Sequence, residues 1–328
     1  MPTPKIYYLA PDFDTPSWGA GMLYHHVRLL RDQGFDAYVL HQKRPFRISW
    51  TEVDVPIAYR NSGLLSPRFQ PDSADILVVP EVQAHTDEVA SFQCRRVVFV
   101  QGGFLILNAF DRAISYPDLG FEAAMAVLPH IRDIVSRHFG LKPVVIPPFV
   151  APYFFTDPDS LDRQRRKRIL IAGKADYRKA GYLDYDIASK LIARFIADRP
   201  DWELTELAGL DHRQTAETMR DSSFLVNVNL FESFNAIVPE AMAAGCLPFC
   251  YEAYGGQDFL QTGRNAFVWP NNYIYPMIEG LFETIDRYDD RKGELDAMRR
   301  AAFETVSGFN ERRTAQALAE FFGPRIAA

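Results

Sequence analysis

The chain has 328 residues, and 48% of them are apolar, which is enough to bury two separate hydrophobic cores. Its 36 basic and 42 acidic residues leave a formal net charge of -6. This acidic balance argues against binding along a nucleic-acid backbone, which requires a basic surface. We therefore expect a globular protein of two domains without a nucleic-acid partner.

Cysteine usage and hydropathy bear on where the protein works. Cys94, Cys246 and Cys250 cannot all pair, and their apolar neighbours predict buried thiols in a reducing compartment. No apolar run approaches the roughly 20 residues that span a bilayer, and the N-terminus does not resemble a signal peptide. We expect a cytoplasmic protein. The basic run Arg163–Arg168 is more typical of a solvated linker than of a lipid site, and peripheral contact with the inner face of a membrane stays open.

The N-terminal half alternates short apolar runs with segments of helical period, which is the pattern of βαβ units around a parallel sheet. The first run, Ile6–Ala10, predicts a strand, and a loop with Gly19 and Gly21 follows it. An amphipathic helix then ends near Gly34. Further strands are expected at 37–40, 76–79, 97–100, 126–128 and 144–146, with a helix over 129–139.

The C-terminal half repeats the alternation after a break. The periodic pattern stops at Pro147–Pro152, and a polar stretch continues to Arg168, as expected of a connection between domains. A strand over 168–173 and a helix over 188–197 then follow. Further strands are expected at 204–207, 224–228, 247–250 and 266–269, and the segments from about Ile274 onward are predicted to be helical.

Both halves are therefore predicted to be Rossmann-like, doubly wound α/β domains that face a central cleft. The expected divisions are an N-terminal domain over 1–152, a hinge over 153–167, a C-terminal domain over 168–305, and a final helix over 306–328 that can pack back on the N-terminal domain.

The most informative window is Phe231–Gly245, which directly follows a predicted strand. Glu232 would then project from the carboxyl edge of the sheet, where open α/β sheets bind ligands. Asn235 can cap the next helix and Pro239 suits its first turn, so the positive end of that helix would point at a bound diphosphate. Glu240 lies in the opening turns, within reach of a ribose. An ordinary amphipathic helix with a capping acid would give the same pattern.

Glu232 and Glu240, separated by seven residues, resemble the E-x7-E motif of retaining GT-B glycosyltransferases, especially family 4. Val145–Val150 resembles the hinge strand and loop of that family, although proline and phenylalanine replace the usual asparagine and glycine. Gly245–Phe249 and Gly255–Gly256 resemble the family's next strand and loop. The resemblance covers essentially the whole C-terminal half and, more loosely, the N-terminal strand and glycine loop.

The resemblance implies transfer of a sugar from a nucleotide-diphosphate donor to an acceptor hydroxyl, with retention and without a metal or other cofactor. The acceptor would be a glycan, a lipid-linked sugar or a small molecule. Glu232 is expected to face the donor sugar and Glu240 to hold the nucleotide ribose. The remaining residues predicted to bind the donor are Ser233, Phe234, Asn235, Ala236, Gly173, Gly19 and Gly21.

The family also places cations just after the first strand of the second domain, and Lys174, Arg178 and Lys179 stand there in this chain. Lys174 occupies the usual arginine position, and an alanine separates Lys179 from Gly181. Breaking a glycosyl–phosphate bond leaves a diphosphate whose charge grows in the transition state, so fixed cations aimed at it would speed the reaction. We therefore predict catalytic roles for Glu232 and these cations.

Three acid pairs, Asp12–Asp14, Asp157–Asp159 and Asp184–Asp186, could hold Mg²⁺ in another fold, but turn or surface roles are the better interpretation here. Tyr24 stands where a dinucleotide motif starting at Gly19 needs its third glycine, which argues against a nicotinamide cofactor. The glycines are instead expected to let the backbone approach the donor diphosphate.

The acceptor side is less defined. Gln101 ends a strand where many relatives carry a histidine, so no titratable base is supplied at that position. His130, Glu81 and Asp12 are candidates for acceptor contacts, and the aromatic residues Trp18, Phe104 and Phe110 could stack on a sugar or simply pack in the core.

Two alternatives to a transferase stay open at this point. A nucleotide-sugar epimerase or a hydrolase with paired carboxylates would convert the donor without an acceptor. A non-catalytic protein could bind the sugar nucleotide and keep the fold without the chemistry, because function belongs to the site rather than to the fold.

Overall fold

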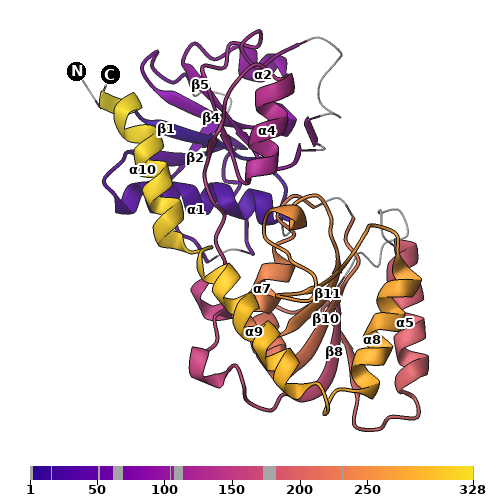
Figure 1. The fold of residues 1–328 in the computed structure, drawn as a ribbon. Coiled ribbons are helices and arrows are strands. Elements are labelled where there is room, and N and C mark those ends of the chain that lie inside the picture. The colour runs from indigo at the N-terminus through magenta and orange to yellow at the C-terminus, as the bar shows by residue number, and fades with distance from the viewer. Residues whose placement is uncertain are drawn as a thin grey trace. The chain divides into compact units, whose positions relative to one another are not determined.

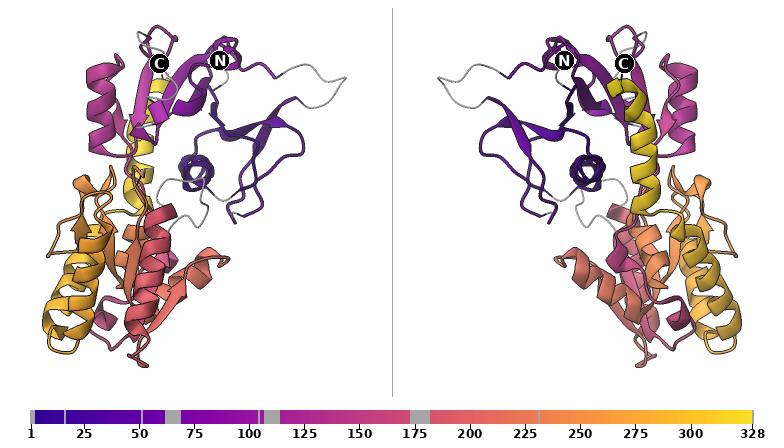
Figure 2. Two further views of the ribbon diagram at one scale, coloured as in Figure 1. Left: turned by 90° about the vertical axis from the view of Figure 1, so that its right-hand side faces the viewer. Right: turned by 90° about the vertical axis from the view of Figure 1, so that its left-hand side faces the viewer.

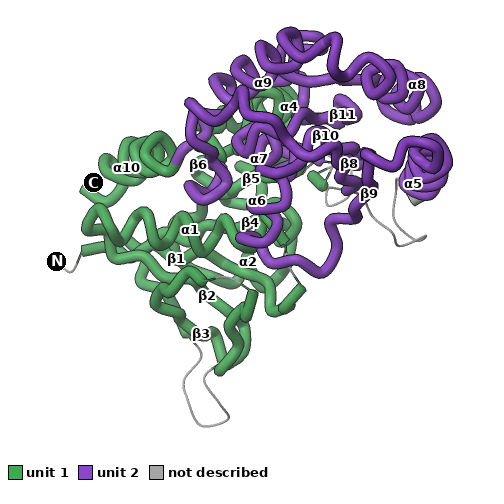
Figure 3. The backbone as a smooth tube through the Cα atoms, turned by 90° about the horizontal axis from the view of Figure 1, so that it is seen from below, with its two compact units in different colours: residues 1–148, 311–328 green, residues 149–310 purple. Residues whose placement is uncertain are grey.

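A computed structural model describes residues 3–15, 17–50, 52–61, 69–103, 105–106, 114–172, 182–230 and 232–327. Contacts within the chain divide it into two compact units (Figure 3). Unit 1 comprises Met1–Pro148 and Glu311–Ala328, and unit 2 comprises Phe149–Asn310. The chain therefore leaves unit 1 once and returns to it for the final helix. The domain and hinge boundaries derived from the sequence stay predictions.

Unit 1 contains a seven-stranded sheet with the order β3-β2-β1-β4-β5-β6-β7, and its neighbouring strands are parallel. The strands are β1 (Ile6–Leu9), β2 (Ala37–Lys43), β3 (Ile57–Asn61), β4 (Ile76–Pro80), β5 (Arg95–Val100), β6 (Ala123–Ala126) and β7 (Val144–Val145). All residues of the central strands β1 and β4 are buried, as expected of a parallel sheet that is covered on both faces.

The helices of unit 1 are α1 (Trp18–Asp32), α2 (Asp87–Ala90), α4 (Pro129–His138) and α10 (Glu311–Ala327). The last of these lies beside α1 (Figure 1). His26 of α1 packs between the rings of Tyr8 and Phe99, at centroid distances of 5.7 and 4.8 Å. Phe322 of α10 contacts the same Tyr8 ring, and Thr314 donates a hydrogen bond of 2.8 Å to the carbonyl of Pro147. The C-terminal helix thus completes the core of unit 1.

Unit 2 contains a five-stranded parallel sheet with the order β12-β11-β10-β8-β9. Its strands are β8 (Arg166–Ala172), β9 (Glu203–Glu206), β10 (Ser222–Asn227), β11 (Leu247–Tyr251) and β12 (Phe267–Trp269). Its helices are α5 (Tyr182–Ile196), α6 (His212–Asp221), α7 (Ile237–Ala244), α8 (Ile274–Asp286) and α9 (Lys292–Ser307). Helices α5 and α8 lie side by side on one face (Figures 1 and 2), and α7 packs against α6 and α9 on the other.

The core of unit 2 contains a chain of aromatic rings that crosses the sheet. Trp202 stacks on Phe224 of β10, with ring centroids 5.9 Å apart. Phe224 meets Phe249 of β11 edge to face at 5.3 Å, and Phe249 stacks on Phe267 of β12 at 4.2 Å. Such ring pairs add roughly 0.5–1.5 kcal/mol each to the burial of their surface. Neighbouring strands are therefore joined by side chains as well as by backbone hydrogen bonds.

The structure departs from the sequence prediction at three places in unit 1. Ile57–Asn61 is an edge strand that was not predicted, because its residues are only partly buried and show no alternation. The strand expected at 126–128 is found at Ala123–Ala126. Gly19 lies in the first turn of α1 rather than in a loop before it.

Two further expectations concern the thiols and the membrane. Cys246 and Cys250 are buried, whereas Cys94 is partly exposed. Across the described ranges, no helix is both long enough and apolar enough to cross a bilayer.

Candidate active site

In unit 2 the order of the strands reverses between β8 and β10, since β9 lies on one side of β8 and the later strands lie on the other. Ala172 and Asn227, the last residues of β8 and β10, are directly paired in the parallel register. Ligands of open α/β sheets bind outside the carboxyl ends of the strands at such a reversal. Residues 228–230 follow β10 at this edge of the sheet, and residues 232–236 lead into α7.

Three asparagine side chains fix that segment. Asn235 Nδ2 donates to Asn227 Oδ1 at 2.9 Å, and Asn229 Nδ2 donates to Asn235 Oδ1 at 3.5 Å. Asn235 has a φ of 50°, in the left-handed region that asparagine tolerates better than most residues, and it is 7% exposed. The prediction that Asn235 caps α7 is wrong. The cap is Ala236, without a side-chain hydrogen bond, because the Asn235 amide is engaged by the sheet.

The loop after β11 supports the same segment from a second side. The carbonyl oxygen of Glu232 accepts hydrogen bonds from the amides of Tyr254 and Gly255, at 3.2 and 3.3 Å. A Cβ atom on Gly255 would lie 1.2 Å from the carbonyl oxygen of Ser233, so only glycine permits this approach. The backbone that carries Glu232 is therefore held by hydrogen bonds from the loop after β11 and by close contact with it.

Glu240 lies in the first turn of α7 and is partly buried. Burial raises the pKa of its carboxyl group from 4.5 to about 8. At neutral pH a protonated carboxyl can both donate to and accept from a hydroxyl pair such as that of a ribose. Glu232 precedes the amino end of α7 and Glu240 follows it, so both acids flank the positive end of the helix dipole.

Gly173, Lys174, Arg178 and Lys179 lie outside the described residues, and their roles stay predictions. Ser233 is 5% exposed and Phe234 is 3% exposed, so their side chains face the protein interior. Any contact they make with a donor would therefore come from the backbone.

In unit 1 the strand order reverses between β1 and β4, and α1 begins at the same edge. A Cβ atom on Gly19 would lie 3.3 Å from Oε1 of Gln101, and one on Gly21 would lie 3.3 Å from the ring of Trp50. Both glycines thus make room for neighbouring side chains within the first turn of α1, where Ser17 is the N-cap residue. The expectation that they form a loop is corrected by this placement.

Glu81 directly follows β4 and is only 2% exposed. Its Oε1 accepts a hydrogen bond of 2.7 Å from the amide of Gly102, which comes shortly after β5. Burial raises the pKa of the Glu81 carboxyl group to about 7. A buried carboxyl group therefore lies at the carboxyl edge of the first sheet. Phe104 and Phe110, two of the proposed stacking residues, lie outside the described residues.

Asp12 has a structural role in unit 1. Its carboxylate accepts hydrogen bonds from the amides of Gln42 and Lys43, at 3.0 and 2.9 Å, and from Nδ1 of His41 at 3.0 Å. The other ring nitrogen of His41 accepts from the hydroxyl of Tyr24 at 2.6 Å, which fixes the neutral tautomer with its proton on Nδ1. Asp12 therefore ties the loop after β1 to the end of β2.

The carboxylates of Asp14, Asp157, Asp184 and Asp186 are also engaged within the protein. Asp14 binds the amide and hydroxyl of Ser49 at 2.6 and 2.7 Å. Asp157 accepts from the amide of Asp159 at 3.0 Å. Asp184 accepts from the hydroxyl of Tyr251 at 2.6 Å, and Asp186 forms an ion pair of 2.7 Å with Lys190. These contacts agree with turn and surface roles.

No protein-family model matches the chain. An alpha-1,6-glucosyltransferase of Actinobacillus pleuropneumoniae serotype 7 is 25% identical over 236 residues, which cover 70% of this chain and 67% of that protein. Among solved structures, a glycosyltransferase from Rickettsia africae is similar over 99% of both chains, with a TM-score of 0.69 and 13% identity. Sucrose-phosphate synthase from Thermosynechococcus elongatus is similar over 99% of both chains, with a TM-score of 0.70 and 12% identity.

A third structure, HepE of Anabaena in complex with UDP-glucose, covers 98% of this chain and 99% of its own, with a TM-score of 0.66 and 14% identity. The chain has the GT-B glycosyltransferase fold. The predicted fold is thus confirmed by the solved structures, and the predicted class of enzyme, a glycosyltransferase, is confirmed by the curated relative. The site residues of this GT-B chain stay predictions.

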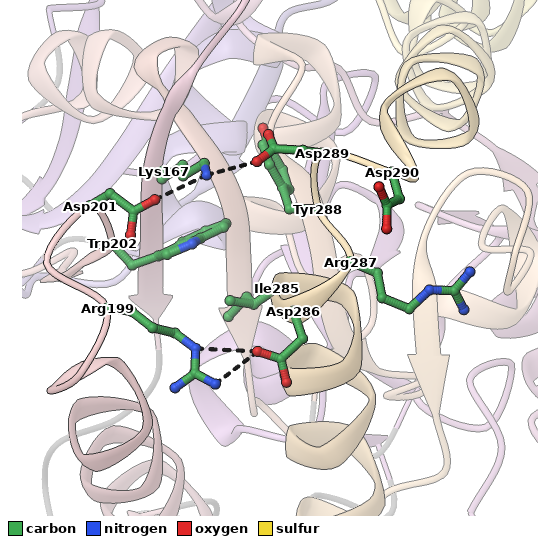
Figure 4. Close-up of a pocket in the computed structure, with 10 residues that line it drawn as sticks. All are labelled: Lys167, Arg199, Asp201, Trp202, Ile285, Asp286, Arg287, Tyr288, Asp289 and Asp290. Carbon is green, nitrogen blue, oxygen red and sulfur yellow. Dashed lines mark hydrogen bonds and ion pairs between the residues drawn. The ribbon is translucent and has the colours of Figure 1, made fainter.

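The GT-B chain also has a pocket of about 340 Å³ at the amino edge of the second sheet (Figure 4). Lys167 near the start of β8 pairs with Asp201 and Asp289, at 3.0 and 3.1 Å, and Arg199 pairs with Asp286 at 2.8 Å. The charged side chains that line the pocket are therefore already paired with one another and are not left to bind a charged ligand. The pocket lies at the opposite edge of the sheet from Glu232 and is therefore no part of the candidate active site.

Sequence reasoning missed the partners of the E-x7-E window in this GT-B chain. Asn227 lies inside a predicted strand and Asn229 directly after it, and no role was predicted for either, although two polar amides at the carboxyl end of a buried strand are a signal in themselves. The close approach of Gly255 to Ser233 involves two loops that are distant in the sequence. No local sequence pattern therefore predicts this contact.

Proposed function

We propose that this chain transfers a hexosyl unit from a uridine-diphosphate sugar to an acceptor hydroxyl, with retention at the anomeric carbon and without a metal. The observation that carries the proposal is the pair of Glu232 and Glu240 around the amino end of α7, at the strand-order reversal of the second sheet. The Anabaena protein solved with UDP-glucose and the curated glucosyltransferase support a uridine nucleotide and a hexose as the donor.

Different groups of the site are proposed to bind the different parts of the donor. The amino end of α7 and the expected cations Lys174, Arg178 and Lys179 would stabilise the diphosphate as it leaves. Glu240 would hold the ribose hydroxyls, and Glu232 would orient the hydroxyls of the transferred sugar. The rigid backbone around Glu232 keeps this carboxylate in place, which lowers the entropy that must be lost in reaching the transition state.

The proposal is tested with purified protein and a panel of UDP-, GDP- and dTDP-sugars, by measuring nucleotide release with and without an acceptor mixture, in EDTA. We expect release to depend on the acceptor and to persist in EDTA. Conversion of the donor at the same rate without any acceptor would show a hydrolase or epimerase instead. Binding without turnover on every tested acceptor would favour a non-catalytic sugar-nucleotide-binding protein.

Substitution of Glu232 gives the sharpest result. We expect Glu232→Ala to lower the transfer rate at saturating donor by about 10²–10³-fold, because a group aimed at the reacting sugar acts mainly in the transition state. Binding of the donor, measured by calorimetry, should partly survive. Glu279→Ala on the exposed face of α8 is the matched control and should leave the rate unchanged. Full turnover in Glu232→Ala would remove this residue from the mechanism.

The cytoplasmic location and the peripheral contact with a membrane stay predictions of the sequence. The acceptor is expected to bind at the carboxyl edge of the first sheet, where Glu81 supplies a buried carboxyl group and Gln101 directly follows β5.

A further inference from the structure

Two arginine side chains are buried in unit 2. Arg165, just before β8, is 4% exposed, and Arg299 of α9 is 3% exposed. Helix α9 packs against α7, and the guanidinium group of Arg165 covers Gly245 at the carboxyl end of α7, where a Cβ atom would lie 2.2 Å from Nη2. Arginines are almost never fully buried unless their charge is compensated.

The protein compensates this charge only in part. Arg165 donates to the carbonyls of Leu161 and Ala244, at 2.8 and 3.4 Å. Arg299 Nη1 donates to Asp296 at 2.7 Å, and that carboxylate also binds Lys292 at 2.6 Å. The carbonyl end of α7 adds roughly half a negative charge. The carboxylate of Asp296 is therefore divided between Arg299 and Lys292, while Arg165 donates to backbone carbonyl groups.

Three buried donors are left over within the part of the chain that the structure describes. Nε of Arg165 and both Nε and Nη2 of Arg299 have no hydrogen-bond partner there. Nε–H and Nη2–H of one guanidinium group point the same way and form the edge that binds anions through two parallel hydrogen bonds. Burial, followed by the charge of Arg299, lowers the pKa of Arg165 to about 10, as expected of cations that lack a full complement of anions.

We propose that the Nε–Nη2 edge of Arg299, beside Arg165, binds a small inorganic anion behind helix α7. Such an anion would satisfy the orphaned donors and offset the excess positive charge, both of which are costly in a buried environment. The site lies at the carboxyl end of α7, whereas the donor diphosphate is proposed at its amino end. An eight-residue helix is about 12 Å long, so the two sites are separate and the inference does not depend on the proposed function.

Thermal unfolding at constant ionic strength tests the inference, with sodium gluconate replaced stepwise by chloride, nitrate, sulfate or phosphate. Gluconate is too large to enter a buried site. We expect the midpoint of the wild-type protein to rise saturably, by about 2–4 °C, with at least one of the small anions. A midpoint that is the same in all five salts would overturn the proposal and show that water satisfies the donors.

Variants then locate the effect. Arg299→Lys keeps the charge but loses the two parallel donors, so its midpoint should no longer depend on the anion. Arg300→Lys, the neighbouring exposed arginine of α9, is the matched control and should respond as the wild-type protein does. An equal response in Arg299→Lys would place the anion elsewhere. If that variant does not fold, wild-type crystals grown in bromide decide the matter, since an anomalous peak is expected within hydrogen-bond distance of Arg299 Nε and Nη2, and its absence contradicts the site.

Discussion

At the scale of single residues, Glu240 shows how position on a helix changes the chemistry of a carboxyl group. Its place in the first turn of α7 favours the ionised form through the helix dipole, but burial has the opposite and larger effect and raises its pKa to about 8. The folded protein therefore keeps the Glu240 proton over a pH range in which the unfolded chain has lost it.

The first prediction at this scale concerns stability and pH. Because the pKa of Glu240 is higher in the folded state, its contribution to stability is fully present below pH 4.5 and is lost as the pH rises through about 8. Glu240→Gln cannot ionise, so its urea midpoint should fall less than that of the wild-type protein between pH 5 and 9.

The pKa of Glu81 is also raised, so its ionisation lowers stability over the same pH range in both proteins. Only the difference between the wild-type and Glu240→Gln curves of urea midpoint against pH therefore reports on Glu240. The exposed Glu279→Gln serves as the control, and its curve should follow that of the wild-type protein. Parallel curves for Glu240→Gln and the wild-type protein would show that burial does not perturb this carboxyl group.

The placement of Glu232 and Glu240 could be predicted because their spacing, a preceding strand and Pro239 all indicate one helix start at the edge of a sheet. The pairing of Asn235 with Asn227 could not, since it requires a left-handed backbone conformation that the sequence does not specify. Arg299 was equally hidden. It lies in a helical, charge-rich segment where arginine is normally solvated, and only the packing of α9 on α7 buries it.

At the scale of elements, the crossing of two loops determines the shape of the candidate site. Gly255 follows β11 and Ser233 follows β10, and the two strands are adjacent and parallel, so the loops leave the sheet side by side. The approach of the Gly255 Cα to the Ser233 carbonyl leaves no room for a side chain. The loop after β11 thus sets the position of the backbone that carries Glu232.

We predict that Gly255→Ala displaces this backbone. A Cβ atom 1.2 Å from a carbonyl oxygen forces one loop to move, so donor affinity and the transfer rate should both fall by at least about 10-fold, since positioning errors of this size cost up to about 10² in rate. Unfolding should show a loss of about 1–3 kcal/mol. Gly293→Ala in α9 meets no atom within 4 Å and is the matched control, with normal activity and unchanged or slightly raised stability. Normal donor affinity in Gly255→Ala would contradict the role given to this crossing.

The strands that are buried throughout were predicted from the sequence, whereas the partly buried strand β3 was not. The buried strands β1, β4, β10 and β11 were predicted as continuous apolar runs, which is how central parallel strands appear in a sequence. β3 was not predicted because an edge strand needs little apolar surface and therefore gives only a weak signal in the sequence. The turn holding Gly19 was misread because glycine commonly indicates a loop, whereas here it admits the Gln101 side chain against a helix.

At the scale of the whole molecule, the chain closes its first unit with its last helix. Two separate runs of alternating strands and helices predicted two sheets, and both are present. The crossing between units falls at Pro148–Phe149, inside the proline-rich stretch where the periodic pattern of the sequence stops. The return at Glu311 brings Phe321 and Phe322 into the core of unit 1, where both are at most 2% exposed.

The final prediction follows from this return. Removal of residues 311–328 takes Phe322 away from Tyr8 and takes Thr314 away from the Pro147 carbonyl, so unit 1 should lose stability while unit 2 keeps its own core. Hydrogen–deuterium exchange should show loss of protection in β1 and α1, with protection in β8, β10 and β11 retained.

A single substitution that keeps the full chain distinguishes the loss of core packing from the loss of the whole helix. Phe322→Ala should cost about 3–5 kcal/mol and should produce the same pattern of exchange in a weaker form, because a large cavity then opens beneath Tyr8. Gly323→Ala, at a position with no atom within 4 Å of the added Cβ, should leave exchange in α1 unchanged. Equal loss of protection in the strands of unit 2 would mean that the two cores unfold together, whereas unchanged exchange in α1 would mean that α10 adds nothing to the first core.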